Sequence, residues 1–351
     1  MTSFKSITVA AALSVAGGAA LAQTTLIHGE AGPNRGARAD ALQWFADQLA
    51  DRSGGDLTVD IQWGGALFKS EAAVQSIADG VADMGSVIAV YYPQEMVGYG
   101  IADLPVNNPD AWVGMRATDE LMRSSQAIQD DLADKNLVYI GTWTTSQVNI
   151  GCKNAAIRTV ADIDGLKVRG VGAYGKVFGD EGANMVNMSI YDAYQGLDTG
   201  LIDCSQGYSY AVAALKQAEV MTSYTLLDWG QVGGLGIFMN KDTFDSLEPD
   251  QQETLLETGE DMADEFGRMI TEANDAAVAS MKEAGVEVIE FPAEERTQLV
   301  EAGQKFLDEW VQMADASGLP GEQLLDDYRS LIAKYTEQRD ADGYPWDAKA
   351  D

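Results

Sequence analysis

The sequence predicts an α/β protein of two domains, and three observations support this fold class. About 330 residues follow an apolar N-terminal segment, and a chain of that length exceeds the usual size of a single hydrophobic core. Short apolar segments typical of strands alternate with amphipathic helical segments from Thr24 onward. A long helical periodicity begins at Pro249 and ends at Gly285, so this helix is longer than a small domain.

Residues 1–22 are expected to form a secretory signal. Lys5 supplies the positive region, Ile7 to Leu21 form an apolar run, and Ala20-Leu21-Ala22 gives a small-x-small cleavage site before Gln23. The alternative, a membrane anchor, is disfavoured because the run is shorter than the ~18–20 residues of a spanning helix. The mature protein is therefore expected to be soluble outside the cytoplasm, without insertion into the membrane.

The first part of the chain alternates strands and helices. Residues 24–29, 57–63 and 83–90 are expected to form strands, and residues 41–55 and 69–80 are expected to form the helices between them. This βαβαβ run indicates a largely parallel sheet with helices on both faces. Ligands bind beyond the carboxyl ends of such strands. Phe68 follows one of these ends, so it either forms a pocket wall or covers core.

A second α/β unit follows extended segments at residues 137–143 and 147–153. Strands at 166–170 and 202–206 enclose helices at 174–183 and 189–200, and a strand at 235–240 is expected to return to the first domain. The helix from Pro249 covers about 32 residues, or ~48 Å, which is enough to lie across both domains. A strand at 286–291 and helices near 306–313 and 324–335 complete the pattern.

These elements predict the division of the chain. The first lobe is expected to comprise residues 23–146 and about 235–272, and the second lobe residues 147–234 and about 273–340. Residues 341–351 are expected to form a loose tail.

Composition argues against several classes of function. The chain has 55 acidic and 23 basic residues and a net charge of −32, which disfavours nucleic acid and anionic membrane surfaces as partners. With His28 as its one histidine, a Ser-His-Asp or Cys-His catalytic group has little support. The glycine-rich segment GVGAYG lacks the wider context of a nucleotide-binding fingerprint. We therefore expect neither a cofactor nor an enzymatic reaction.

Cys152 and Cys204 are the two cysteines of the chain. An even number of cysteines in an exported protein favours a disulfide, with two separate buried thiols as the alternative. The bond would close a loop of about 50 residues and add ~3–4 kcal/mol to stability. Two cysteines and one histidine do not make a convincing zinc site, so no metal is expected.

Arg169 is the leading candidate for ligand binding. It lies on the short predicted strand LKVRG, and a guanidinium group pairs with a carboxylate through two parallel hydrogen bonds. The alternative is an ordinary surface arginine. Rings at strand ends or in loops are candidates for the wall of a small-molecule site, although each alone is more typical of core: Phe68, Tyr91, Tyr92, Trp143, Tyr174, Tyr208, Tyr210 and Trp229.

Four motifs resemble those of a known family. The segments GGALF-x-x-E at 64–71, IADGVADMG at 77–85, DIDGLKVRG at 162–170 and YDAYQGLDTGLID at 191–203 look like those of the solute-binding subunits of TRAP (tripartite ATP-independent periplasmic) transporters, the DctP-like family. The resemblance covers about residues 24–315. It implies a periplasmic binding protein of two α/β lobes with mixed sheets and a long helix spanning both. Such a protein closes on a small organic acid and delivers it to membrane permease subunits.

The resemblance also implies which residues bind the ligand. Arg169 matches the arginine that pairs with the substrate carboxylate, whereas Asn149 and Gly207 stand where some relatives have a second arginine and an asparagine. Glu30 and Trp229 match cleft positions. The expected ligand-binding residues are Arg169, Asn149, Phe68, Glu30, Trp229, Tyr208, Gln206, Tyr191 and Trp143.

The ligand expected from this set is a monocarboxylate with a ring, a hydroxyl group or a zwitterionic part. Arg169 would be its main charged contact, and Glu30 would meet the cation of a zwitterion. Aromatic acids, hydroxy or keto acids, sugar acids and ectoine-like osmolytes all remain open. Two other classes are the receptor of an ATP-driven importer, which has the same two-lobe architecture, and a secreted lyase or hydrolase.

Overall fold

Two mixed β-sheets organise the chain. The computed structural model describes residues 23–108 and 110–347, and the predicted signal segment, residues 1–22, lies outside them. In the first sheet the strand order is β2-β1-β3-β10-β4, with β1 (Thr24–Gly29), β2 (Leu57–Gln62), β3 (Met84–Ile88), β4 (Leu137–Trp143) and β10 (Leu235–Asn240). Strand β1 pairs in parallel with β2 and β3, whereas β10 lies antiparallel between β3 and β4. The predicted return of residues 235–240 is confirmed, and it makes the sheet mixed.

Helices flank this first sheet and define the first lobe. They are α1 (Ala37–Arg52), α2 (Ala73–Ala78), α3 (Ala111–Ser124), α4 (Gln126–Ala133) and α8 (Lys241–Asp245). Side-chain caps set three of their starts, because Asp110 accepts a hydrogen bond from the backbone N–H of Val113, Ser125 from that of Ile128, and Asn240 from that of Thr243. Short 3₁₀ helices occur in both lobes: η1 (Ser70–Ala72), η2 (Ala89–Tyr91), η3 (Tyr99–Asp103), η4 (Val160–Ile163), η5 (Ile190–Asp192) and η6 (Gln217–Glu219).

The second sheet forms the second lobe, with strand order β11-β9-β5-β8-β6-β7. Its strands are β5 (Asn149–Cys152), β6 (Lys167–Arg169), β7 (Asn184–Val186), β8 (Cys204–Gly207), β9 (Ser223–Leu226) and β11 (Glu287–Glu290), and its helices are α5 (Gly172–Asp180), α6 (Ala193–Thr199) and α7 (Ser209–Ala214). The sequence did not predict β7 or β9. Both are three or four residues long, too short for a clear two-residue period.

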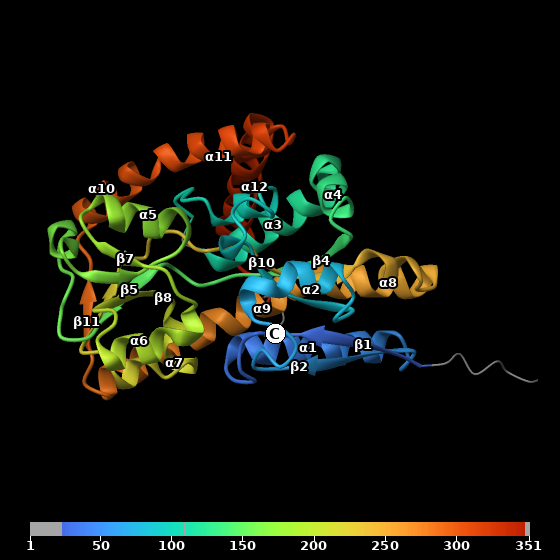
Figure 1. Cartoon of the computed structure of the whole chain (residues 1–351), viewed down its shortest axis with the longest axis horizontal. Coiled ribbons are helices and arrows are strands. Elements are labelled where there is room, and N and C mark those ends of the chain that lie inside the picture. Colours follow the sequence, from blue (N-terminus) through green and yellow to red (C-terminus); the bar gives the residue numbers. More distant parts are fainter. Residues whose placement is uncertain (1–22, 109, 348–351) are drawn as a thin grey trace, which may run out of the picture.

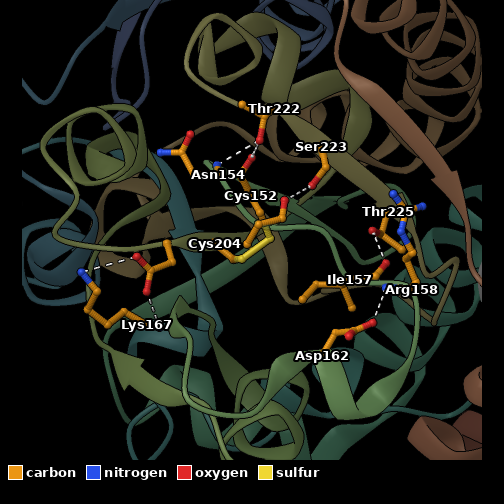
Figure 2. The surroundings of a disulfide bond; sticks show 12 residues. Cys152, Asn154, Ile157, Arg158, Asp162, Lys167, Cys204, Thr222, Ser223 and Thr225 are labelled. Atoms are coloured by element: carbon orange, nitrogen blue, oxygen red, sulfur yellow. Dashed lines mark hydrogen bonds and ion pairs between the residues drawn. A yellow bond between two sulfur atoms is a disulfide. The ribbon is translucent and has the colours of Figure 1, made fainter.

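A disulfide joins Cys152 of β5 to Cys204 of β8, as favoured from the sequence (Figure 2). The two cysteines are direct partners in the antiparallel pairing of these strands. Next to the bond, hydroxyl groups of β9 hold the segment that follows β5, since Ser223 Oγ donates to the carbonyl of Ala155 at 2.6 Å and Thr225 Oγ1 to that of Ile157 at 2.7 Å. The centre of the second sheet is thus fixed both covalently and by buried hydrogen bonds.

Helix α9 (Pro249–Glu283) links the lobes, as predicted from the long periodicity (Figure 1). Proline suits its first turn, where the missing N–H is not needed. The helix packs on α1, α3 and β4 of the first lobe and on α7 and β11 of the second. Gly259 permits the close approach to β4, because a Cβ there would overlap the carbonyl of Ile140. Further along, Ala277 and Met281 enter the core of the second lobe.

The C-terminal helices are α10 (Ala293–Gly303), α11 (Lys305–Ala316) and α12 (Gly321–Asp342). Helix α10 packs on α5 of the second lobe, but α12 packs on α3 of the first lobe. Trp310 of α11 also donates from Nε1 to the carbonyl of Val97 at 3.0 Å, and Tyr335 lies edge-on to Trp112. The predicted assignment of all residues up to 340 to the second lobe therefore differs from this packing.

The predicted loose tail is wrong for residues 341–347. Helix α12 extends to Asp342, and the Tyr344 ring then stacks on Trp346 with ring centres 4.6 Å apart. The Tyr344 hydroxyl donates to Asp110 Oδ2 at 2.7 Å, and Arg339 pairs with the same carboxylate at 2.7 Å. These contacts fix the segment against the start of α3. Residues 348–351 lie outside the described residues.

Candidate functional site

A cavity lies between the two lobes, with walls from both. The space between its lining side chains, including the part open to solvent, is about 580 Å³. The first lobe contributes residues after the carboxyl ends of β1, β3 and β4, as expected for a parallel arrangement. The polar and aromatic lining residues are Arg35, Arg38, Tyr91, Trp143, Thr145, Tyr191, Tyr208 and Tyr210.

The DIDGLKVRG segment places Arg169 beside this cavity. Asp162 accepts hydrogen bonds from the backbone N–H groups of Arg158 and Thr159, just before η4. These hydrogen bonds lower the pKa of the Asp162 carboxyl group. Gly165 then takes a left-handed φ of 75°, which glycine adopts without strain. The chain enters β6, where Arg169 pairs with Ser205 of β8.

Arg169 is buried, with 1% of its surface exposed. Its Nε donates to the carbonyl of Met188 at 3.1 Å, Nη1 to that of Gln206 at 3.2 Å, and Nη2 to the Tyr91 hydroxyl at 3.2 Å. Within the described residues, no carboxylate lies at ion-pair distance from this guanidinium. A buried cation without a counter-ion is costly, so an anion that reaches it gains a large interaction.

Gln206 and Tyr208 hold the second-lobe side of the site. Gln206 Oε1 accepts from the backbone N–H of Val171 at 2.9 Å, and its Nε2 donates to the Tyr208 hydroxyl at 3.2 Å. Burial raises the pKa of Tyr208 above its usual range, and the charge of Arg169 partly opposes that rise. Tyr208 is therefore a neutral hydroxyl at physiological pH. It lines the cavity, as do Tyr191 and Tyr210.

The Tyr91 hydroxyl connects the lobes at the cavity. Tyr91 belongs to η2 of the first lobe, and its oxygen accepts hydrogen bonds from Arg169 Nη2 and from the backbone N–H of Ile190, each at 3.2 Å. Both donors belong to the second lobe. The hydroxyl therefore stabilises the arrangement in which the lobes are in contact.

We expect Tyr91→Phe to weaken ligand binding by about 3- to 10-fold, since removing a hydrogen-bonded hydroxyl typically costs ~0.5–1.5 kcal/mol. Isothermal titration calorimetry with a ligand of the wild-type protein measures this change. Tyr92→Phe is the matched control, because the Tyr92 hydroxyl donates to the carbonyl of Ser70 within the first lobe. Equal weakening by both variants would contradict the connecting role of Tyr91.

Arg38 is a second buried arginine at the cavity, and the sequence interpretation missed it. Its Nη1 lies 2.7 Å from Glu30 Oε1, and its Nη2 donates to the carbonyl of Pro33 at 2.9 Å. Burial alone would lower the pKa of Arg38, but the Glu30 carboxylate and nearby tyrosines raise it above its ordinary value. Arg38 is thus charged and has an internal counter-ion, unlike Arg169. Arg35, at the same cavity, is exposed.

Glu30 is held on several sides by the protein. Besides Arg38, it accepts from the backbone N–H of Gly32 at 2.6 Å and from Ser86 Oγ at 2.5 Å. His28 Nε2 lies 3.2 Å from the same Ser86 hydroxyl, and burial lowers the pKa of His28 to about 4, so its ring is neutral at pH 7. The cation expected for Glu30 is therefore Arg38 of the protein itself.

Six of the nine predicted site residues are not among those that line the cavity, and three of these make contacts elsewhere. Asn149 Oδ1 accepts from the backbone N–H of Asp228 at 2.9 Å, which fixes the loop after β9. Phe68 fills the space over the backbone of Gly29 and Gly85, the core-covering alternative. Trp229 is fully buried edge-on against Tyr174, with ring centres 4.8 Å apart. Trp143, Tyr191 and Tyr208 do line the cavity. Arg169 contacts the lining residue Tyr91, Gln206 contacts Tyr208, and Glu30 pairs with Arg38.

Two features are absent from the described part of the chain. Among those residues, no group of three or more histidine, cysteine, aspartate or glutamate side chains is arranged to hold a metal ion. No helix in the same ranges is long and apolar enough to cross a membrane.

Comparisons with known proteins agree with this architecture. Residues 28–313 match the family model DctP, "Bacterial extracellular solute-binding protein, family 7". The chain is 26% identical over 255 residues, 71% of its length and 76% of the relative's, to the 2,3-diketo-L-gulonate-binding periplasmic protein YiaO of Escherichia coli.

Solved structures are similar over nearly the whole fold. A TRAP solute-binding protein from Rhodoferax ferrireducens, in complex with copurified benzoate, has a TM-score of 0.81 at 23% identity, covering 90% of this chain and 99% of that one. The sugar acid binding protein DctPAm from Advenella mimigardefordensis, in complex with galactonate, has a TM-score of 0.77 at 21% identity, with coverage of 89% and 99%. The family match spans most of the two lobes and both walls of the cavity, so this chain belongs to the DctP family of bacterial extracellular solute-binding proteins.

Proposed function

We propose that the protein is the periplasmic solute-binding subunit of a TRAP transporter and that it captures a small organic monocarboxylate. The observation that carries this proposal is the buried guanidinium of Arg169, which has no carboxylate partner among the described residues. A ligand carboxylate would supply the missing counter-ion. It would also accept hydrogen bonds from the guanidinium N–H groups that the protein leaves free.

The ligand class follows from the one buried arginine that has no carboxylate partner among the described residues. Arg169 is available for one carboxylate, whereas Arg38 already has Glu30. Three similar proteins are known with 2,3-diketo-L-gulonate, benzoate and galactonate, and all three of these ligands are monocarboxylates. The tyrosines and tryptophan at the cavity suit a ring or a sugar chain. Aromatic acids and sugar acids are therefore the leading candidates, and the pairing of Glu30 with Arg38 disfavours a zwitterion.

The mechanism is capture and delivery without turnover. A ligand that contacts both walls favours the state in which the lobes meet, because its contacts are made in full only there. The ligand-loaded form would then dock on the membrane permease subunits of the transporter. A bound acid that changed chemically during incubation, followed by nuclear magnetic resonance, would support the secreted enzyme instead.

A comparison of acids with their amides tests the carboxylate requirement. Mass spectrometry of the purified protein first identifies a co-purifying acid, and a thermal-shift screen of aromatic, hydroxy, keto and sugar acids extends the list. Each binder is then compared with its carboxamide, which has the same shape without the charge. At 100 times the dissociation constant, an acid should add ~2.7 kcal/mol of stability. An amide that binds as tightly as its acid would contradict the proposal.

A further inference from the structure

Two buried hydrogen-bond donors on the first-lobe side of the cavity lack acceptors. Nε1 of Trp143 has no hydrogen-bond partner among the described residues, and neither does Nη1 of Arg38, whose contact with Glu30 is close but not aligned as a hydrogen bond. The two groups are neighbours, with the Arg38 guanidinium carbon 5.8 Å from the centre of the Trp143 ring. Both residues line the cavity. Buried N–H groups are nearly always paired, so this pair is suited to an acceptor on a ligand.

The buried charges on this side of the cavity cancel, and Arg35, the other cation there, is exposed. Glu30 neutralises Arg38, and the hydrogen bonds from Gly32 and Ser86 hold the Glu30 carboxylate in place. Arg169, in the second lobe, has no such partner. The cavity therefore has two unlike ends, one cationic and one neutral but rich in donors. A carboxylate gains most at Arg169, and an uncharged oxygen gains most beside Trp143.

We propose that Arg38 and Trp143 form a second subsite that binds an uncharged oxygen of the ligand, a hydroxyl or a carbonyl, and that Glu30 disfavours a second carboxylate there. This inference rests on the proposed function and narrows its substrate class to hydroxy or keto monocarboxylates. An acid without the oxygen leaves Nε1 of Trp143 buried and unpaired beside the Arg38–Glu30 ion pair. A dicarboxylate places its second charge next to Glu30.

A site built to donate to a ligand oxygen discriminates strongly against an analogue without it, since the buried donors then lose their water and gain nothing. The subsite is therefore a determinant of specificity, and its loss should remove the discrimination while carboxylate binding at Arg169 persists. This difference separates a recognition role from a structural role for Trp143.

Matched pairs of acids that differ by one oxygen test the subsite. Suitable pairs are phenylacetate with mandelate, benzoate with 3-hydroxybenzoate, and propionate with lactate, each titrated by calorimetry. The wild-type protein should bind the oxygenated member of at least one pair about 10-fold or more tightly. In Trp143→Phe that ratio should fall to about 2 or less, with the plain acid bound nearly as well as before.

Trp229→Phe is the matched control. Trp229 is also buried and its Nε1 also lacks a partner among the described residues, but its ring lies outside the cavity wall. This variant should keep the wild-type ratio. If Trp143→Phe weakened both members of a pair equally, or if the wild type bound both equally, the subsite would be refuted while carboxylate capture stood.

Glu30→Gln tests the charge argument. The change leaves a polar side chain of the same size but exposes the charge of Arg38, so succinate should gain about 10-fold or more relative to butyrate compared with the wild type. An unchanged ratio would overturn the role of Glu30. If no acid of any pair bound to any variant, the proposed capture of monocarboxylates would itself be wrong, and the subsite with it.

Discussion

Arg169→Ala should reduce the affinity for the carboxylate ligand by about 100- to 1,000-fold, since loss of one partner of a buried, hydrogen-bonded charge pair costs ~2–5 kcal/mol. The guanidinium is buried and lacks a counter-ion among the described residues, so nothing else at this end of the cavity replaces it. Arg169→Lys should recover only part of the loss. A lysine retains the charge but offers a single flexible ammonium in place of a rigid fork.

Calorimetry with the co-purifying acid measures these affinities, and circular dichroism shows that each variant is folded. Arg158→Ala is the matched control, because Arg158 also lies in the second lobe but is half exposed and pairs with Glu287. It should bind the acid as the wild type does. Tight binding by Arg169→Ala would show that the carboxylate is held elsewhere.

Replacing both cysteines by alanine should lower the free energy of unfolding by roughly 4 kcal/mol, the chain-entropy value for a loop of this length. The bond closes a segment with a sequence separation of 52 residues, and that segment contains β6, α5, β7 and α6. Without the bond, the unfolded chain gains the freedom of the whole loop. Urea titration of the Cys152→Ala/Cys204→Ala protein, monitored by circular dichroism, gives the difference.

Ligand affinity should change little in the same variant, because hydrogen bonds from β8 still hold β6 and Arg169 in place. Ser223→Ala is a control that removes one neighbouring hydrogen bond, and it should cost only ~1 kcal/mol. A double variant as stable as the wild type would mean that the two sulfur atoms are not joined in the protein.

The sequence was most informative where one segment carried its own signal. The strand at 235–240 and the helix from Pro249 have long apolar patterns, and the structure contains both. The partner of a helix has no such local signal. Helix α12 is amphipathic wherever it packs, so its position on α3 could not be inferred from its own residues.

In the candidate site, too, the sequence revealed only the residue that lies in a recognisable segment. Arg169 could be identified because it lies in a motif, but Arg38 lies between the strand predicted at 24–29 and the helix predicted at 41–55. The position of Arg38 in the chain is nevertheless a signal of function. Arg38 follows the carboxyl end of β1 and falls in the first turn of α1, where the helix dipole disfavours a cation. A residue that breaks a local rule often serves a function. The pairing with Glu30 needed the folded structure.

Helix α9 also determines how the lobes can separate. It packs on α1, α3 and β4 of the first lobe and on α7 and β11 of the second, and second-lobe Tyr210 contacts it at Phe266 and Asn274. Opening must therefore bend this continuous helix or move one lobe along its surface. Thr271 Oγ1 donates to the carbonyl of Gly267 at 2.8 Å, within the stretch that both lobes contact, and such a bond eases the bending of a helix.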